Sequence, residues 1–162
     1  MNRDLNSTVQ IIASQAQPAF SRMVAGTGWF PNADVPEGTI VTNAHVVNGA
    51  TNVYIRLPCD HSTDIEVKVR GISTDLDIAV LELSSVSLER VKAKLGQMYD
   101  DTRIPTLEIG DSDKFQAQKD RSVVDRGYPL GTEYQQFTKG TFSGLKHARE
   151  QCYMVSDAAI NP

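Results

Sequence analysis

The feature that most constrains the fold is a series of short runs in which apolar and polar residues alternate, separated by turn-forming segments. Residues 65–70 (IEVKVR) alternate strictly, which predicts a strand with its apolar side chains on one face and its charges on the other. Further β-branched or apolar runs occupy residues 7–14, 39–41 and 52–57, and the pair at 48–49 (NG) is typical of a tight turn. Repeated short strands of this kind predict an all-β, antiparallel barrel architecture and not a parallel sheet.

One stretch departs from the β pattern. Between residues 84 and 103 the apolar residues Leu88, Val91 and Leu95 recur at helical spacing. This spacing predicts either a short amphipathic surface helix or a flexible insertion. The stretch is also a candidate partner surface, although a solvated connecting helix explains the same pattern.

Composition limits the classes of function. The chain has 162 residues, of which 40% are hydrophobic and 22% charged, as in soluble globular proteins of one domain, or one and a part. A net charge of −4 gives no support to a nucleic-acid partner. No apolar run approaches the ~20 residues of a membrane helix. Residues 1–6 lack the apolar region of a signal peptide, so an intracellular location is favoured. With only Cys59 and Cys152, two free thiols are expected.

Two residues are candidates for proton-transfer chemistry. His45 lies in residues 42–47 (TNAHVV), directly after a short apolar run that predicts a buried strand, where its ring would reach the edge of a cleft. Asp77 precedes the alternating residues 78–83, and the intervening chain is long enough to return to the same cleft. A carboxylate beside an imidazole fixes its tautomer and stabilises its protonated form. Each residue also has a structural explanation, as a strand-end histidine and as a turn residue, and Asp75 competes with Asp77.

Other candidates are weaker on chemical grounds. Ser156 lies in an alternating strand pattern without adjacent glycines, and Cys152 precedes tyrosine and methionine, so both are predicted to be strand residues. The segment 58–64 contains four potential metal ligands, which are Cys59, Asp60, His61 and Asp64. Their spacing fits no common zinc pattern, and we expect a solvated polar loop. No cofactor or metal site is predicted.

Several motifs, taken in order, resemble the HtrA/Deg family of trypsin-like serine proteases. The matching segments are residues 26–30 (GTGWF), 40–47 (IVTNAHVV), 77–81 (DIAVL), 107–113 (LEIGDSD), 127–131 (GYPLG) and 156–162 (SDAAINP). The resemblance covers nearly the whole chain. It implies a double β-barrel in which His45 is the general base, Asp77 its orienting carboxylate and a polypeptide the substrate. It also implies a homo-oligomer, often a trimer, in a family that often carries PDZ domains after the protease.

The resemblance stops just before the segment that carries the nucleophile in the family. In the family, the segment ending in DAAINP continues as Gly-Asn-Ser-Gly-Gly, which supplies the nucleophilic serine and the oxyanion hole, whereas this sequence ends at Pro162. We therefore expect the nucleophile just after Pro162 and an inactive 162-residue chain. The alternative is a non-catalytic binding or structural module that keeps the protease scaffold within a larger assembly.

The expected organisation has three parts. Residues 1–83 form an N-terminal barrel that carries His45 and Asp77, and residues 84–106 form the connection or insertion. Residues 107–162 form a partial C-terminal barrel, so that the predicted fold is a trypsin-like double β-barrel with its first barrel complete and its second incomplete.

Overall fold

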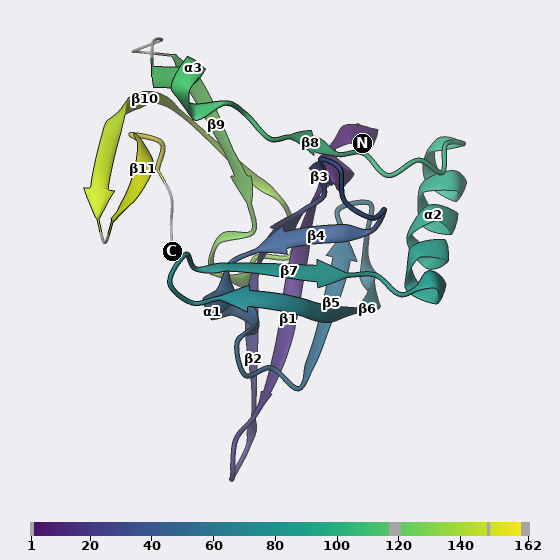
Figure 1. Ribbon diagram of the computed structural model, residues 1–162. Coiled ribbons are helices and arrows are strands. Elements are labelled where there is room, and N and C mark those ends of the chain that lie inside the picture. The colour runs from purple at the N-terminus through teal and green to yellow at the C-terminus, as the bar shows by residue number, and fades with distance from the viewer. Residues whose placement is uncertain (1, 117–120, 149, 160–162) are drawn as a thin grey trace.

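A closed six-stranded barrel forms the centre of the protein, with the strand order β1-β2-β4-β7-β6-β5 (Figure 1). The computed structural model describes residues 2–116, 121–148 and 150–159. The barrel strands are β1 (Thr8–Ala16), β2 (Ser21–Trp29), β4 (Thr39–Thr42), β5 (Asn52–Leu57), β6 (Asp60–Ser73) and β7 (Ile78–Glu82). All their pairings are antiparallel, as the alternating sequence predicts.

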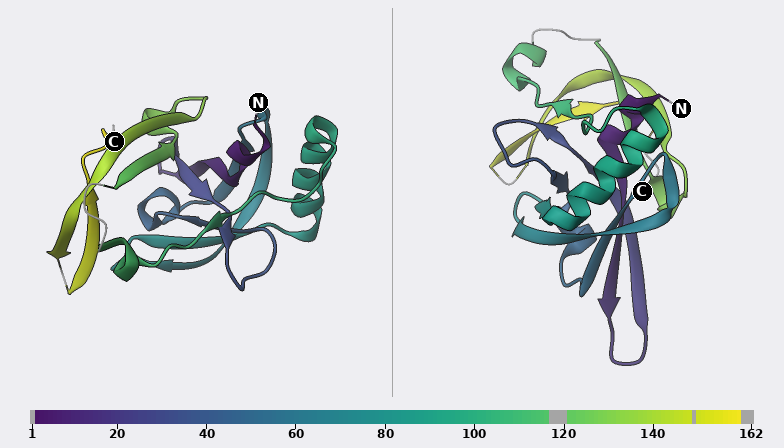
Figure 2. Two further views of the ribbon diagram at one scale, coloured as in Figure 1. Left: turned by 90° about the horizontal axis from the view of Figure 1, so that it is seen from above. Right: turned by 90° about the vertical axis from the view of Figure 1, so that its right-hand side faces the viewer.

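A second, open sheet lies beside the barrel, in the order β11-β10-β9 (Figure 2). Its strands are β9 (Ser122–Gly127), β10 (Gln136–Ala148) and β11 (Gln151–Ser156). The remaining elements are short, and they are η1 (Arg3–Ser7), β3 (Pro31–Asn32), α1 (Ala44–Val47), β8 (Leu107–Glu108), α3 (Ser112–Gln116) and η2 (Pro129–Gly131). The fold is thus all-β at its core, with the first barrel complete and the second incomplete.

The barrel interior is filled by the apolar residues that alternate along the strands. On β6, Ile65 and Val67 are buried while Glu66 and Lys68 are exposed, which confirms the predicted division of the two faces. Fully buried side chains from several strands meet them, and among these are Val9, Ile11, Ile40, Ile55 and Leu81. Burial of this apolar surface is the main free-energy term that closes the barrel.

Two glycines of β2 allow neighbouring elements to approach closely. A Cβ atom on Gly28 would lie 2.7 Å from Ile11 Cδ1, and one on Gly26 would lie 2.7 Å from Val46 Cγ2. Larger residues at either position would therefore push the strand away from the core or from α1.

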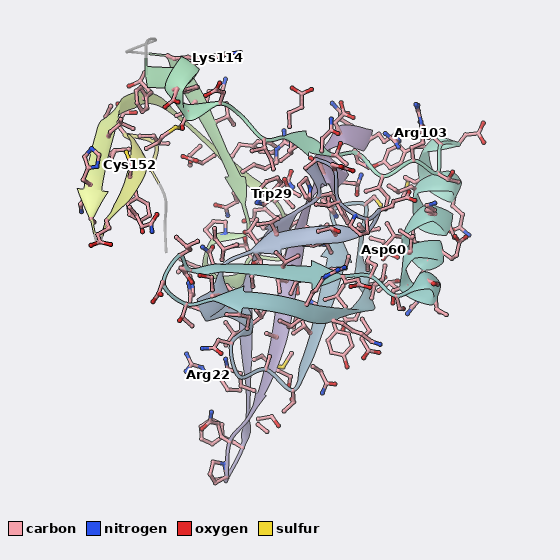
Figure 3. The ribbon with its side chains drawn as sticks, in the orientation of Figure 1. Arg22, Trp29, Asp60, Arg103, Lys114 and Cys152 are labelled. Atoms are coloured by element: carbon pink, nitrogen blue, oxygen red, sulfur yellow. The ribbon has the colours of Figure 1, made fainter. Side chains whose placement is uncertain are left out.

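The stretch that breaks the β pattern is a helix, α2 (Ser85–Tyr99), packed on the barrel. Val91 and Leu95 are fully buried in the barrel core, and Leu88 packs against it. The side chain of Lys94 lies 2.9 Å from the Asp60 carboxylate, which faces the helix from the start of β6 (Figure 3).

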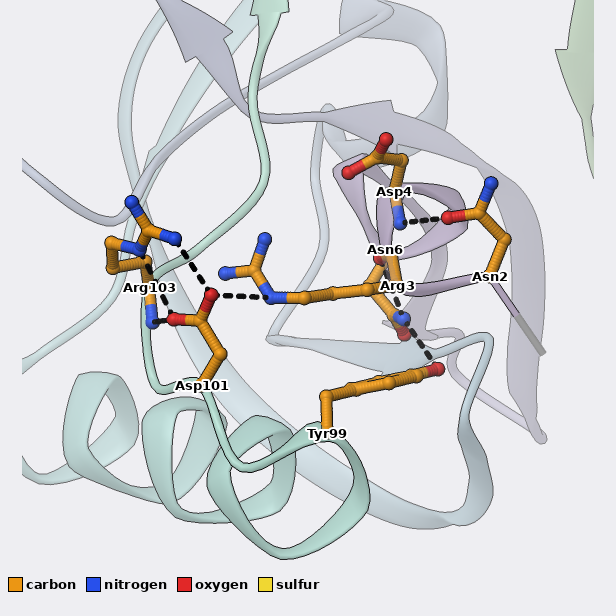
Figure 4. Close-up of polar contacts among 7 residues, drawn as sticks. All are labelled: Asn2, Arg3, Asp4, Asn6, Tyr99, Asp101 and Arg103. Carbon is orange, nitrogen blue, oxygen red and sulfur yellow. Dashed lines mark hydrogen bonds and ion pairs between the residues drawn. The ribbon is translucent and has the colours of Figure 1, made fainter.

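Polar contacts tie the C-terminal end of α2 to the start of the chain (Figure 4). Asn6 Nδ2 donates to the hydroxyl of Tyr99 at 3.1 Å. The carboxylate of Asp101 lies 3.5 Å from Arg3 Nε and 2.8 Å from Arg103 Nη2. The helix and η1 therefore form one surface layer over the end of the barrel.

One local prediction holds only in part and another was wrong. The segment 15–22, where Pro18 predicts a loop, is a loop only at residues 17–20, because residues 15–16 and 21–22 extend β1 and β2 into a long hairpin that projects from the barrel (Figure 1). Residues 58–64, expected as a polar loop, form a tight turn and then the start of β6, where Leu57 pairs with Asp60. Asp60 accepts hydrogen bonds from Ser62 and Thr63, so local side chains satisfy the polar groups that suggested a loop.

Among the residues described, no helix combines the length and apolar character needed to cross a lipid bilayer.

We predict that Leu95→Ala destabilises the protein by about 2–5 kcal/mol, because truncating a fully buried leucine removes apolar burial and leaves a cavity. Urea unfolding followed by circular dichroism measures the change. Met98→Ala, on the same helix at a position that is 57% exposed, is the matched control and should change the unfolding free energy by no more than about 0.5 kcal/mol. Equal losses for the two variants would contradict packing of α2 on the core.

Candidate active site

The pairing of β4 with β7 brings His45 and Asp77 to the same end of the barrel. Thr42, the last residue of β4, pairs with Ala79 near the start of β7. His45 is the second residue of α1, which begins two residues after Thr42, and Asp77 ends the turn that leads into β7. Residues 32 positions apart in the sequence are therefore neighbours in space.

The Asp77 carboxylate makes two separate contacts with His45. Asp77 Oδ2 lies 2.7 Å from His45 Nδ1, and Asp77 Oδ1 accepts the backbone N–H of His45 at 2.9 Å. That N–H belongs to the first turn of α1, where backbone donors lack partners within the helix. Asp77 thus caps the helix and orients the ring. Nδ1 must carry a proton to donate to a carboxylate, which leaves the lone pair on Nε2.

The side chain of Asn43 is a further hydrogen-bond donor to Asp77. It occupies the N-cap position of α1 but makes no capping bond with its side chain. Its Nδ2 instead donates to the backbone carbonyl of Asp77 at 3.1 Å and to Asp77 Oδ2 at 3.3 Å. Asp77 has a φ of 52°, a left-handed conformation that aspartate tolerates because its short side chain bonds locally.

These contacts lower the pKa of Asp77. Partial desolvation by itself raises the pKa of this carboxyl, but the hydrogen bonds from the His45 backbone, the His45 ring and Asn43 outweigh it. The net shift is below the ordinary value, so the group is a carboxylate at neutral pH. An anion beside Nδ1 is the arrangement that stabilises a histidine after it accepts a proton on Nε2.

The His45 ring borders a cleft of about 450 Å³ between the barrel and the second sheet. Its side chain is 70% exposed, and Asp77 is its one hydrogen-bond partner among the residues described. The barrel wall includes Gly26 and Thr27 of β2, and the opposite wall includes Gly127 and Thr138 of the second sheet. An imidazole with a free Nε2 at the edge of a cleft is placed to act as a base on a bound molecule.

Backbone-directed hydrogen bonds fasten the second sheet to the barrel. The N–H of Tyr128 donates to Thr27 Oγ1 at 2.9 Å, and Gln10 Nε2 donates to the carbonyl of Thr132 at 2.9 Å. The Tyr128 ring is buried, and desolvation raises the pKa of its hydroxyl well above the ordinary value. The Tyr128 side chain is therefore a neutral phenol within the wall that faces His45.

The chain returns to this cleft near its C-terminal end. The Asp157 carboxylate accepts hydrogen bonds from the N–H and hydroxyl of Thr141, which lower its pKa, and it ties the end of β11 to β10. Gly140 lies against the backbone of Ala158, because a Cβ there would come within 2.4 Å of Ala158 N. Ala159 then lines the cleft.

Comparison with known proteins agrees with this geometry. The sequence model described as a trypsin-like peptidase domain matches residues 26–162. The chain belongs to the trypsin-like peptidases, in the HtrA/Deg group.

Individual relatives of this HtrA/Deg chain are distant. It is 32% identical over 145 residues to HhoB of Synechocystis sp., covering 85% of this chain and 29% of HhoB. It is 31% identical over 130 residues to Protease Do-like 4, mitochondrial, of Arabidopsis thaliana, covering 76% of this chain and 22% of that protein. The chain thus spans less than a third of the length of these relatives.

Solved HtrA-type structures share its fold. A structure of the HtrA-type protease AlgW with a tripeptide superimposes with a TM-score of 0.71 at 21% identity. That match covers 99% of this chain and 45% of the AlgW chain. The likeness identifies the trypsin-like double barrel, of which this chain holds one closed barrel and part of the second.

The structure separates the other candidate residues of this HtrA/Deg chain from the site. Ser156 Oγ accepts from the N–H of Ala158 at 3.2 Å, and Cys152 pairs with His147 across β10 and β11, far out on the second sheet (Figure 3). Both cysteines are free thiols, as predicted. Asp75 is exposed in the turn before Asp77. The expected nucleophile after Pro162 lies outside the described residues.

The four residues considered as metal ligands do not gather around one point, and two of them are paired with other side chains. Asp60 contacts Lys94, Ser62 and Thr63, while Asp64 pairs with Arg56. Among the described part of the chain, no three potential ligands gather into a cation site.

Sequence reasoning overlooked two polar residues near His45. The role of Asn43 was hidden, because its sequence position suggests a helix cap and only the fold shows that its amide turns to Asp77. Asp125 lies in a run that predicts a strand, and the structure places it in the lining of the cleft.

We predict that Asn43→Ala raises the pKa of Asp77 toward the ordinary aspartate value of about 3.9, because the carboxylate loses a donor. Carboxyl ¹³C shifts followed against pH by NMR measure both proteins. The folded-state pKa lies below the unfolded one, so the stabilisation is complete above the unfolded pKa and is lost as pH falls through the folded pKa. Because its folded-state pKa is higher, the variant should lose this stabilisation at a higher pH than the unaltered protein. An unchanged Asp77 titration would show that Asn43 plays no part.

Proposed function

We propose that this chain supplies the general base and the orienting carboxylate of an HtrA/Deg-type serine endopeptidase. His45 is the base and Asp77 the orienting carboxylate. The attacking serine and the oxyanion hole come from residues that follow Pro162 in the full-length protein. The single observation that carries the proposal is the contact of 2.7 Å between His45 Nδ1 and Asp77 Oδ2, at the rim of a cleft.

The reaction then follows from the geometry. The serine hydroxyl transfers its proton to His45 Nε2 as its oxygen attacks the scissile carbonyl, and Asp77 stabilises the protonated ring. The ring returns that proton to the leaving amine, and a water molecule repeats the sequence to release the acyl group. Neighbouring backbone N–H groups would stabilise the oxyanion.

Three features support a nucleophile from outside the 162 residues. The described lining of the cleft contains neither serine nor cysteine. Ser156 is engaged with the backbone of Ala158. Ala159 already lies on the cleft, so the residues that follow it along the chain start close to His45. For these reasons we expect the 162-residue chain alone to lack peptidase activity.

The size and the walls of the cleft fit a short stretch of extended polypeptide. Its walls are two β structures, and its volume of about 450 Å³ suits a few residues of a substrate and not a whole folded domain. An unfolded or exposed segment of another protein is therefore the proposed substrate.

The test begins with the codons that follow Pro162 in the source transcript and with the protein that they encode. We expect a Gly-x-Ser-Gly-Gly segment, labelling of its serine by a fluorophosphonate probe, and casein cleavage by the extended protein. Asp77→Asn should lower kcat by about 10⁴-fold, since the carboxylate sets the histidine tautomer. Glu82→Gln, at a half-exposed position on β7 whose side chain pairs with Arg70, is the control and should leave cleavage within twofold.

A continuation without such a serine would overturn the proposal. So would an extended, folded protein that neither reacts with the probe nor cleaves casein. Either result would favour the non-catalytic module that keeps the protease scaffold.

A further inference from the structure

The short helix η1 is anchored to the barrel and to α2 by buried polar groups. Asn6 is fully buried, and its Nδ2 donates to the hydroxyl of Tyr99 at 3.1 Å (Figure 4). Its Oδ1 accepts the backbone N–H of Cys59, in the turn before β6, at 3.1 Å. The next residue, Ser7, is also buried, and its carbonyl accepts the N–H of Phe30 at 2.9 Å. These bonds fix η1 independently of the second sheet.

Two side chains of the second sheet donate to this fixed helix. Arg126 Nη1, from β9, donates to Ser7 Oγ at 3.3 Å. Gln135, which directly precedes β10, donates from Nε2 to the carbonyl of Leu5 at 3.1 Å and to that of Thr8 at 3.2 Å. Gln135 Oε1 has no hydrogen-bond partner, so this amide is held by its donated bonds.

The chain between these two donors contains the cleft wall that faces His45. Residues 127–130, which we call the facing wall, all contribute to the lining of the cleft. Gly127 pairs with Gln136, so β9 and β10 meet beside the two donors. Because Arg126 precedes the facing wall and Gln135 follows the loop that continues it, η1 holds this stretch of chain at both ends.

We propose that η1 is a clasp that positions the facing wall against the barrel, with Gln135 and Arg126 as its positioning residues. With these bonds made, the facing wall stays beside the barrel. Without them, it opens locally while the barrel remains folded, because a segment held by few bonds opens at a lower free energy than a core strand. The use of a fixed wall in peptide cleavage rests on the function proposed above, but the hold on the wall does not.

Hydrogen exchange of the ¹⁵N-labelled 162-residue chain measures the two kinds of opening separately. The amide of Tyr128, which donates to Thr27 Oγ1, reports on the facing wall, and those of Ile11 and Ile55 report on the barrel. Gln135→Met keeps an unbranched side chain and removes both donated bonds. We expect it to speed exchange at Tyr128 by about tenfold or more and to leave the barrel amides within about twofold.

Gln97→Met is the matched control, because it makes the same change at an exposed position of α2. All reporting amides should stay within about twofold of the unaltered chain in this variant. An unchanged rate at Tyr128 in Gln135→Met would overturn the proposal. Equal acceleration at Tyr128 and in the barrel would overturn it too, since that result is global destabilisation and not release of a clasp.

A second pair of variants serves if Gln135→Met does not fold. Arg126→Lys keeps a cationic donor for Ser7 Oγ, whereas Arg126→Met removes it. Methionine should therefore speed exchange at Tyr128, and lysine should restore most of the protection. Equal rates at Tyr128 in these two variants would then overturn the proposal.

Asn6→Ala tests whether the hold passes through η1. Because Asn6 seats the helix and Gln135 grips it, the double variant should speed exchange at Tyr128 by less than the product of the two single effects. Strictly multiplicative effects would show that Gln135 acts without η1 and would reject the clasp.

No step of these experiments uses cleavage, so the two proposals fail separately. An extended protein that cleaves nothing would reject the peptidase, and the exchange rates would still decide the clasp. Normal cleavage together with unchanged exchange in Gln135→Met would reject the clasp and keep the peptidase.

Discussion

The antiparallel pairing of β4 with β7 is the constraint on which the site depends. It places the end of one strand beside the start of the other, so that the short helix after β4 and the turn before β7 meet at one rim of the barrel. Barrel closure fixes β4 between β2 and β7. The core residues that close the barrel therefore set the distance between His45 and Asp77.

Within that frame, one carboxylate serves two purposes. Asp77 caps α1 through the backbone of His45 and orients the ring through Nδ1, so the helix and the imidazole share an anchor. The left-handed backbone at Asp77 turns its side chain into place, and Asn43 holds it there. Fixing both the backbone and the ring of His45 to one group reduces the freedom that a base would otherwise lose on reaction.

The second sheet contributes the facing wall of the cleft and most of its chemical character. Its attachment includes hydrogen bonds at the backbone of Tyr128 and Thr132 and at the side chains of Arg126 and Gln135. Both Asp125 and Arg126 of β9 contribute to the lining of the cleft.

Local sequence patterns predicted the all-β class and most of the strands, although not the start of β6. Alternation at 65–70 gave the strand faces, helical spacing of Leu88, Val91 and Leu95 gave α2, and the ordered motifs pointed to the family, because these signals are local. The chemistry of the residues left Asp75 and Asp77 as equal candidates and the resemblance implied Asp77, whereas the contact itself, with Asp77 Oδ2 at 2.7 Å from His45 Nδ1, appears only in the folded chain. The fold likewise turns the amide of Asn43 toward Asp77. Contacts across the fold depend on strand register and barrel closure, which no local pattern records.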